Sequence, residues 1–348
     1  MPYLDIIRIF SLTTLAFLVA LSWTPLLTHF LYKYKLGKQI RDSASAPIMS
    51  QLHQAKAGTP TMGGILIWLT TLFLALVFFY VSQTWPGSFL AKFNFLSRPQ
   101  TLLPLGALVA SALVGLVDDY FNIRRWGPKG GGLTMKHRLF VYTIIAVIAA
   151  GWFYFKLGWD FIHVPFVGDF FIGAWYLPLF VFIIVATAFS VNEIDGLDGL
   201  AGGTLLAVFA GYGVISFVQG KFDLAVFCGV ISGALLAFLW FNIPPARFFM
   251  GDTGAMAMGV TVGILAMLTN TVFLLPIMGL LFVVESGSVI IQVTSKKFRG
   301  KKVFLSSPIH HHLEAIGWPE AKIVMRFWVI ASVCLVASLV LFLVDKGY

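Results

Sequence analysis

Long apolar runs recur from one end of this 348-residue chain to the other, and they limit its fold more than any other feature. The chain is 59% hydrophobic and 11% charged, whereas soluble domains are roughly 45–50% apolar. No polar block is long enough to fold separately. We therefore predict an all-α, polytopic integral membrane protein in which residues 1–348 form a single transmembrane domain.

A bilayer core of about 30 Å needs roughly 20 apolar residues per helix. On that scale ten spans are predicted, at about 6–30, 61–82, 101–118, 138–156, 175–191, 199–219, 223–241, 255–271, 273–293 and 323–344. Only the polar patch Thr269, Asn270 and Thr271 separates the eighth span from the ninth, and Pro276 lies inside the ninth. Proline removes a backbone donor, so we expect a kink there.

The basic residues orient these spans, because cytoplasmic loops retain Lys and Arg. If the loop after the first span is inside, 18 of the 24 basic residues are inside. These are Lys33, Lys35, Lys38, Arg41, Lys56, Arg124, Arg125, Lys129, Lys136, Arg138, Arg247, Lys296, Lys297, Arg299, Lys301, Lys302, Lys322 and Arg326. Both termini are then periplasmic. The net charge of +9 is a topology signal and does not indicate nucleic-acid binding.

Acidic residues gather at the predicted inside ends of the spans, where they are costly and usually functional. Six of the 15 acids do so, namely Asp118, Asp119, Glu193, Asp195, Asp198 and Asp252. Asp118 and Asp119 end the third predicted span and would repel each other unless a cation shares them. A Mg²⁺ site or a catalytic base explains the pair; the alternative is a solvated helix end, which the helix dipole disfavours.

Two further motifs combine polar residues with glycine. VNEIDGLDGLAGG joins the fifth and sixth spans and carries Asn192, Asp195 and Asp198, which can accept hydrogen bonds from a nucleoside or bind a metal. A tight turn capped by Asn and Asp is the alternative. FNIPPARFFMGDTG carries Asn242, Phe249 and Asp252. Asp252 either caps the following helix or ligates Mg²⁺.

Three consecutive histidines, His310, His311 and His312, precede the last span. Consecutive side chains point in different directions, so they rarely form one zinc site, and diphosphate binding or proton transfer is the better interpretation. Lys56 and Lys136 could neutralise phosphates, although each also fits an ordinary cytoplasmic lysine. All these motifs lie on loops predicted to face the cytoplasm.

These motifs together resemble the phospho-N-acetylmuramoyl-pentapeptide transferases of the polyprenyl-phosphate N-acetylhexosamine-1-phosphate transferase superfamily. The resemblance spans nearly the whole chain. Its motifs are TPTMGG at 59–64, VDDY at 117–120, DGLDGLAGG at 195–203, FNIPPARFFMGDTG at 241–254, PIHHHLEAIGWPE at 308–320 and RFW at 326–328.

The resemblance implies an enzyme that transfers phospho-MurNAc-pentapeptide from UDP to undecaprenyl phosphate with Mg²⁺, giving lipid I and UMP in peptidoglycan synthesis. It implies catalytic roles for Asp118, Asp119, Asp252 and His310, with Asp252 and Asp119 at the metal. The implied substrate-binding residues are Lys56, Thr61, Asn122, Lys136, Asn192, Asp195, Asp198, Asn242, Phe249, His311 and His312. The family often has a lysine at position 122, and many members have Leu-Thr at the positions of Glu193 and Ile194.

Two other functions are alternatives for a chain of this kind. A transferase for UDP-N-acetylglucosamine or another UDP-hexosamine would use the same carboxylates. A secondary transporter would place its acids near the bilayer midplane in repeated halves, whereas these lie at span ends and no internal repeat is seen. The expected location is the bacterial inner membrane with the active site facing the cytoplasm. The bilayer and a second copy of the chain, as a homodimer, are candidate partners.

Overall fold

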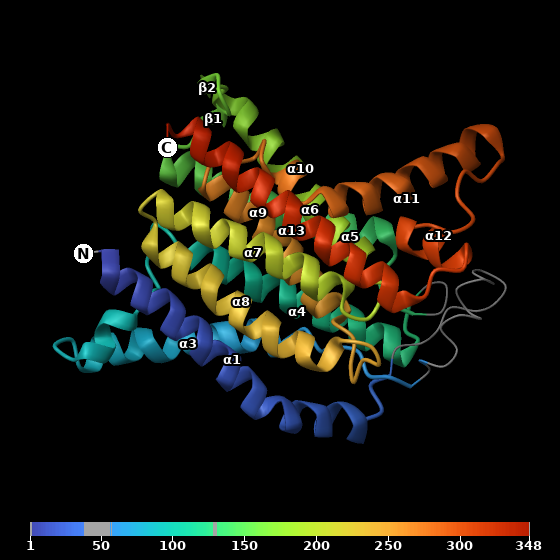
Figure 1. Cartoon of the computed structure of the whole chain (residues 1–348), viewed down its shortest axis with the longest axis horizontal. Coiled ribbons are helices and arrows are strands. Elements are labelled where there is room, and N and C mark those ends of the chain that lie inside the picture. The colour runs from blue at the N-terminus through green and yellow to red at the C-terminus, as the bar shows by residue number, and fades with distance from the viewer. Residues whose placement is uncertain (1, 38–55, 57, 128–130, 348) are drawn as a thin grey trace.

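Long helices dominate the computed structural model, which describes residues 2–37, 56, 58–127 and 131–347 (Figure 1). Among these residues, nine helices are long and apolar enough to cross a membrane. They are α1 (Pro2–Lys33), α3 (Ile65–Thr84), α4 (Leu102–Arg124), α5 (Met135–Gly151), α6 (Tyr176–Ile194), α7 (Leu200–Val218), α8 (Phe222–Asn242), α9 (Gly251–Leu268) and α13 (Glu320–Asp345). The predicted all-α, polytopic membrane class is confirmed.

The segment predicted as the ninth span, 273–293, is not one continuous helix. It is broken at Gly279 into the short helix α10 (Leu275–Met278) and α11 (Leu280–Arg299), which leaves the bundle (Figure 1). Polar residues occupy the buried face of α11, and its last turn is basic. The short helix α12 (Ile309–Ala315) then packs on α11 before the chain enters α13.

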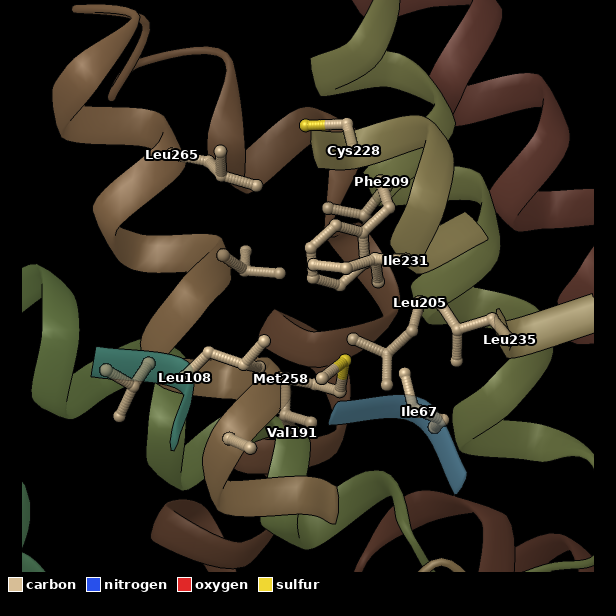
Figure 2. Close-up of a cluster of buried hydrophobic side chains, with 14 of the residues drawn as sticks. Ile67, Leu108, Val191, Leu205, Phe209, Cys228, Ile231, Leu235, Met258 and Leu265 are labelled. Atoms are coloured by element: carbon tan, nitrogen blue, oxygen red, sulfur yellow. The ribbon is translucent and has the colours of Figure 1, made fainter. Parts of the chain in front are cut away.

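Helix α9 forms the centre of the bundle, and 94% of its residues are buried. Figure 2 shows Met258 and Leu265 of α9 among apolar side chains from neighbouring helices, including Leu108 of α4 and Val191 of α6. Lipid tails are as apolar as these side chains, so close packing rather than the hydrophobic effect favours such contacts. The glycine- and alanine-rich sequence of α9 lets its neighbours approach closely.

The approach of α4 to α9 depends on Gly115. A Cβ atom at this position would overlap the backbone of Asp252 and Thr253 at the start of α9. Because Asp118 lies one helical turn after Gly115, this packing brings the carboxylates of α4 beside the first turn of α9.

The start of α1 and the end of α13 lie at the same end of the bundle (Figure 1). A hairpin of β1 (Phe161–Val164) and β2 (Gly168–Phe171) lies there as well, and His163 contacts Asp345 at 2.7 Å. Termini at one end agree with the predicted topology, but which side of the membrane they face stays a prediction. Three of the predicted inside residues, Lys38, Arg41 and Lys129, lie outside the described residues.

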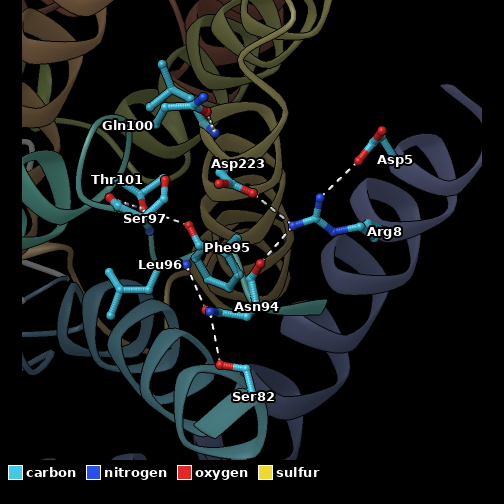
Figure 3. Close-up of polar contacts among 11 residues, drawn as sticks. Asp5, Arg8, Ser82, Asn94, Phe95, Leu96, Ser97, Gln100, Thr101 and Asp223 are labelled. Carbon is cyan, nitrogen blue, oxygen red and sulfur yellow. Dashed lines mark hydrogen bonds and ion pairs between the residues drawn. The ribbon is translucent and has the colours of Figure 1, made fainter. Parts of the chain in front are cut away.

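Arg8 joins three segments at this end (Figure 3). Its guanidinium lies 2.9 Å from Asp5 of α1 and 2.9 Å from Asp223 of α8. It also donates a hydrogen bond of 2.8 Å to the carbonyl of Asn94, just after the 3-10 helix Phe89–Phe93. Arg8 is 9% exposed, so its loss leaves these oxygen atoms without a partner in a poorly hydrated place.

We therefore expect Arg8→Met to destabilise the folded protein by about 2 kcal/mol, the usual cost of leaving buried acceptors unpaired. Thermal unfolding in detergent, followed by size-exclusion fluorescence, measures the change. Lys92→Met is the matched control, because Lys92 is an exposed cation at the same end. Equal unfolding midpoints for the two variants would contradict a structural role for Arg8.

Candidate active site

Four side chains from four helices form a connected polar cluster at the opposite end of the bundle. Arg138 of α5 places Nε 2.8 Å from Asp118 Oδ2 of α4 and Nη2 2.8 Å from Asp252 Oδ2 of α9. Its Nη1 donates to Asn192 Oδ1 of α6 at 3.0 Å, and Asn192 Nδ2 donates to Asp252 Oδ1 at 2.7 Å. We call Asp118, Arg138, Asn192 and Asp252 the Arg138 network.

The position of Asp118 and Asp119 differs from the prediction of a span that ends at residue 118. Helix α4 continues to Arg124, where Arg125 stops it in the left-handed conformation with φ of 57°. The two carboxylates are therefore inside the helix and buried, at 0% and 3% exposure. This excludes the alternative of a solvated helix end.

Asp119 points to different partners from Asp118, as expected for neighbouring residues on a helix. It accepts hydrogen bonds from Thr61 Oγ1 at 3.3 Å and from the backbone amide of Thr253 at 3.0 Å. Asp119 thus ties the segment before α3 to the first turn of α9. Its role as a metal ligand stays a prediction.

Asp252 lies in the first turn of α9, as predicted. Its carboxylate oxygens are engaged by Arg138 and Asn192, and the residue at the N-cap position is Met250, which makes no side-chain capping bond. Asp252 is therefore not the N-cap residue of α9, and its role as a Mg²⁺ ligand stays a prediction.

The oxygen atoms of the Arg138 network suit a Mg²⁺ ion, which prefers oxygen ligands. Asp118 Oδ2 is fully buried and has no well-aligned hydrogen-bond donor among the described residues, although it pairs with Arg138. The described residues contain no group of three His, Cys, Asp or Glu side chains that could hold a metal. A Mg²⁺ ion here would therefore take its remaining ligands from water and substrate phosphates, which is its usual habit.

A second ionic cluster, Lys56, Asp198 and Glu320, lies beside the turn between α6 and α7. Lys56 Nζ is 2.7 Å from Asp198 Oδ1 and 2.5 Å from Glu320 Oε1. Asp198 Oδ2 also accepts from the backbone amide of Ala246 at 3.0 Å. We call these three residues the Lys56 network. It brings together motifs that are far apart in the sequence.

Asn242 and Phe249 build the loop that faces this turn. Asn242 Oδ1 accepts from the amide of Gly199 at 2.9 Å, and Nδ2 donates to the carbonyl of Phe248 at 2.9 Å. Phe249 is half-buried, and its backbone pairs with Pro60 and Gly63. Both residues therefore organise the loop backbone, while a direct contact with a nucleotide stays a prediction.

The three histidines turn to three different partners, as the sequence predicts. His310 Nδ1 is 2.9 Å from Glu285 Oε2 of α11, and both side chains have 0% exposure. His311 Nδ1 is 2.7 Å from Glu314 Oε2, whereas His312 Nδ1 accepts from the amide of Leu305 at 3.3 Å. His310 is thus the histidine held by a buried carboxylate of another helix.

His310 also contacts the turn between α6 and α7. A Cβ atom on Gly196 would overlap the imidazole ring at Nε2, so this position in the DGLDGL motif requires glycine. Nε2 is buried and has no hydrogen-bond partner among the described residues. Buried polar atoms in native proteins are nearly always hydrogen-bonded, so His310 Nε2 is a candidate atom for contact with a water or a ligand.

The remaining predicted site residues, Lys136, Asn122 and Asp195, belong to neither network. Lys136 is exposed in the first turn of α5, two residues before Arg138. Asn122 is half-buried on α4, beside Gly132. Their contacts with substrate stay predictions, as does the role of Asp195.

Sequence reasoning missed three residues that the structure brings to this end. The sequence pattern marks Arg138 only as one of the basic residues that orient the spans, and it does not mark Glu285 or Glu320 as site residues. A usable signal existed for the first two, because each lies within a predicted apolar span and an intramembrane charge needs a partner. Glu320 lies before the last predicted span, where a carboxylate carries no such signal.

The pair of Glu285 and His310 gives a stability prediction. Glu285→Leu should lower the free energy of unfolding by about 3 kcal/mol, because it leaves the buried imidazole without its partner. The double variant Glu285→Leu/His310→Phe should recover most of that loss, since an apolar pair of similar volume satisfies the same space. Thermal unfolding in detergent measures both.

Ser286→Ala is the control for this pair, because Ser286 is a buried neighbour on α11 that hydrogen-bonds to Ser190. It should cost about 1 kcal/mol, the usual contribution of one hydrogen bond. If the double variant were less stable than Glu285→Leu, the two residues would not act as a pair.

Two protein-family models match parts of the chain that carry residues of these clusters. Residues 101–270 match the model for glycosyl transferase family 4, which covers the Arg138 network. Residues 56–67 match signature 1 of the phospho-N-acetylmuramoyl-pentapeptide-transferases, which includes Lys56 and Thr61.

Curated relatives match nearly the full chain. A phospho-N-acetylmuramoyl-pentapeptide-transferase from Chloroflexus aggregans (strain MD-66 / DSM 9485) is 36% identical over 98% of this chain and 91% of its own length. One from Geobacillus sp. (strain WCH70) is 39% identical over 91% of this chain and 92% of its own length. With its buried carboxylates, its histidine motif and this level of identity, the chain belongs to the phospho-N-acetylmuramoyl-pentapeptide-transferase family.

Proposed function

We propose that this protein transfers phospho-MurNAc-pentapeptide from UDP-MurNAc-pentapeptide to undecaprenyl phosphate, forming lipid I and UMP, as the first membrane step of peptidoglycan synthesis. The observation that carries the proposal is the Arg138 network, which gathers carboxylates and a cation at one end of an apolar bundle. Family membership supports the choice of substrate class.

The proposed chemistry needs positioning and charge compensation more than covalent help. A phosphate oxygen of the acceptor attacks the phosphorus that bears the sugar. The bond from that phosphorus to the UMP oxygen breaks, and UMP leaves with the electron pair. Mg²⁺, when bound, neutralises charge that develops on the diphosphate.

The chain's own residues divide these tasks. Asp118 orients the acceptor phosphate or takes its proton, and Asp252 with Asp119 serves the metal. Asp195, Asp198 and Asn242 hold the nucleoside near the Lys56 network, and Asn192 contacts it from the Arg138 network. Phe249 offers a face on which uracil can stack. Of the three histidines, His310 is the one to which we assign contact with the donor diphosphate.

Direct attack and a covalent aspartyl-phosphate intermediate remain the two mechanistic candidates, and we favour direct attack because a phosphate monoester is already a competent nucleophile. A covalent route predicts stoichiometric UMP release from the donor alone and an adduct on an aspartate. A rapid-quench experiment that traps such an adduct at the rate of turnover would exclude direct attack.

The purified protein should release UMP and form a lipid-linked product from UDP-MurNAc-pentapeptide, undecaprenyl phosphate and Mg²⁺. Asp252→Asn should lower turnover by about a hundredfold or more, because loss of charge stabilisation by a metal costs several kcal/mol. Asp169→Asn, at the other end of the bundle, is the control and should keep normal turnover.

The donor itself tests the substrate class. The alternative function is transfer from UDP-N-acetylglucosamine or another UDP-hexosamine. If the protein released UMP faster with such a donor than with UDP-MurNAc-pentapeptide, that alternative would replace the proposal.

We also propose that the protein lies in the bacterial inner membrane with the site end facing the cytoplasm, as the distribution of basic residues indicates. Labelling of single cysteines in intact cells tests this, after Cys334→Ser removes the partly exposed native thiol. Val167→Cys in the hairpin should react with an impermeant maleimide, and Lys302→Cys should react only after lysis. The reverse pattern would invert the topology.

A further inference from the structure

Arg138 is a charged side chain placed between two carboxylates in a poorly hydrated part of the bundle. Its side chain is 16% exposed, while those of Asp118 and Asp252 are 0% and 12% exposed. Buried charges of one sign need compensation, because their repulsion is strong where water is excluded. Arg138 supplies that compensation to both aspartates at once.

All three guanidinium nitrogens are used in this position. Nη1 and Nη2 donate hydrogen bonds to Asn192 and Asp252. Nε lies 2.8 Å from Asp118 Oδ2 but is not aligned as a hydrogen-bond donor. The contact with Asp118 is therefore a close ion pair whose geometry is less well aligned than that of the contacts with Asn192 and Asp252.

One of these partners, the carboxylate of Asp252, is also the one that we assign to a divalent cation. A Mg²⁺ ion binds carboxylate oxygens at about 2.0–2.1 Å. At Asp252 Oδ2 such an ion would compete with the guanidinium, whose Nη2 lies 2.8 Å from that oxygen, because two cations at one carboxylate oxygen repel each other.

We infer that Arg138 is the resident counter-cation of these carboxylates and that it competes with a divalent metal for Asp252. Binding of the metal then requires the guanidinium to withdraw. This inference rests on the proposed function only in assuming that a metal binds at this site.

The competition has a consequence for substrate binding. A guanidinium displaced from the carboxylates remains a cation in the first turns of α5, two residues after the exposed Lys136. Phosphate oxygens are suitable new partners for it. Donor diphosphate and metal should therefore favour each other's binding, and by linkage the effect is reciprocal.

A permanent structural ion pair is the alternative, and it predicts the opposite response to mutation. If Arg138 only held the carboxylates in place, its removal would disorder the ligands and weaken metal binding. If it competes with the metal, its removal frees the same ligands and strengthens metal binding. The sign of the change therefore decides between the two.

The test is Mn²⁺ binding to the purified, substrate-free protein, measured by electron paramagnetic resonance of the free ion. Arg138→Gln keeps an amide donor and removes the charge, and it should tighten Mn²⁺ binding about tenfold, within the usual range of coupling between two sites. Arg124→Gln is the matched control, because it removes an exposed charge from the end of α4. It should leave the affinity within about twofold, because exposed charges are screened.

Thermal unfolding provides a second readout that does not depend on activity. Without metal, Arg138→Gln should unfold at a lower temperature than the wild-type protein, because Asp118 and Asp252 lose their counter-charge. Added Mg²⁺ should raise its midpoint more than it raises that of the wild type. Should the glutamine variant fail to fold, Arg138→Lys takes its place, since a single ammonium cannot match the three guanidinium contacts and should also tighten Mn²⁺ binding.

Unchanged or weaker Mn²⁺ affinity in these variants would overturn the inference, and so would a wild-type protein that binds no Mn²⁺. Failure of the proposed function is distinguishable, because it would appear as wild-type protein that binds Mn²⁺ yet releases no UMP from UDP-MurNAc-pentapeptide.

Discussion

The structure depends on one constraint, which is that every charge buried in an apolar bundle must meet a partner. At the site end the partners come from different helices, so each ion pair also fixes how two helices lie against each other. Arg138 joins α5 to α4, α6 and α9, and Glu285 joins α11 to α12 through His310. The polar groups to which we assign the proposed chemistry therefore also fix how the helices align.

Close backbone packing makes these contacts reachable. Gly115 allows α4 to approach the start of α9, and Gly196 allows the turn after α6 to lie on the His310 ring. A side chain at either position would push a carboxylate or an imidazole away from its partners. Small residues thus act in this membrane protein as they do between transmembrane helices generally, by letting backbones approach, and here they also set the spacing of the site.

The two clusters are suited to the two halves of the proposed reaction. In the proposed function the Arg138 network serves the acceptor phosphate and the metal. The Lys56 network lies where Asn242 and the loop that carries Phe249 meet the turn after α6. Polar side chains and backbone amides connect them, as between Gly199 and Asn242.

The sequence alone determined the membrane class, most helix bounds, and the gathering of Asp118, Asp252 and His310 at one end, because the length of apolar runs and the cost of charges in lipid are local properties. Only the tertiary structure decided that Asp118 is interior to α4, that α11 leaves the bundle, and that Arg138, Glu285 and Glu320 are partners of the predicted residues. These features depend on which helix faces meet, and that is set by packing between segments distant in the chain, which no local pattern records.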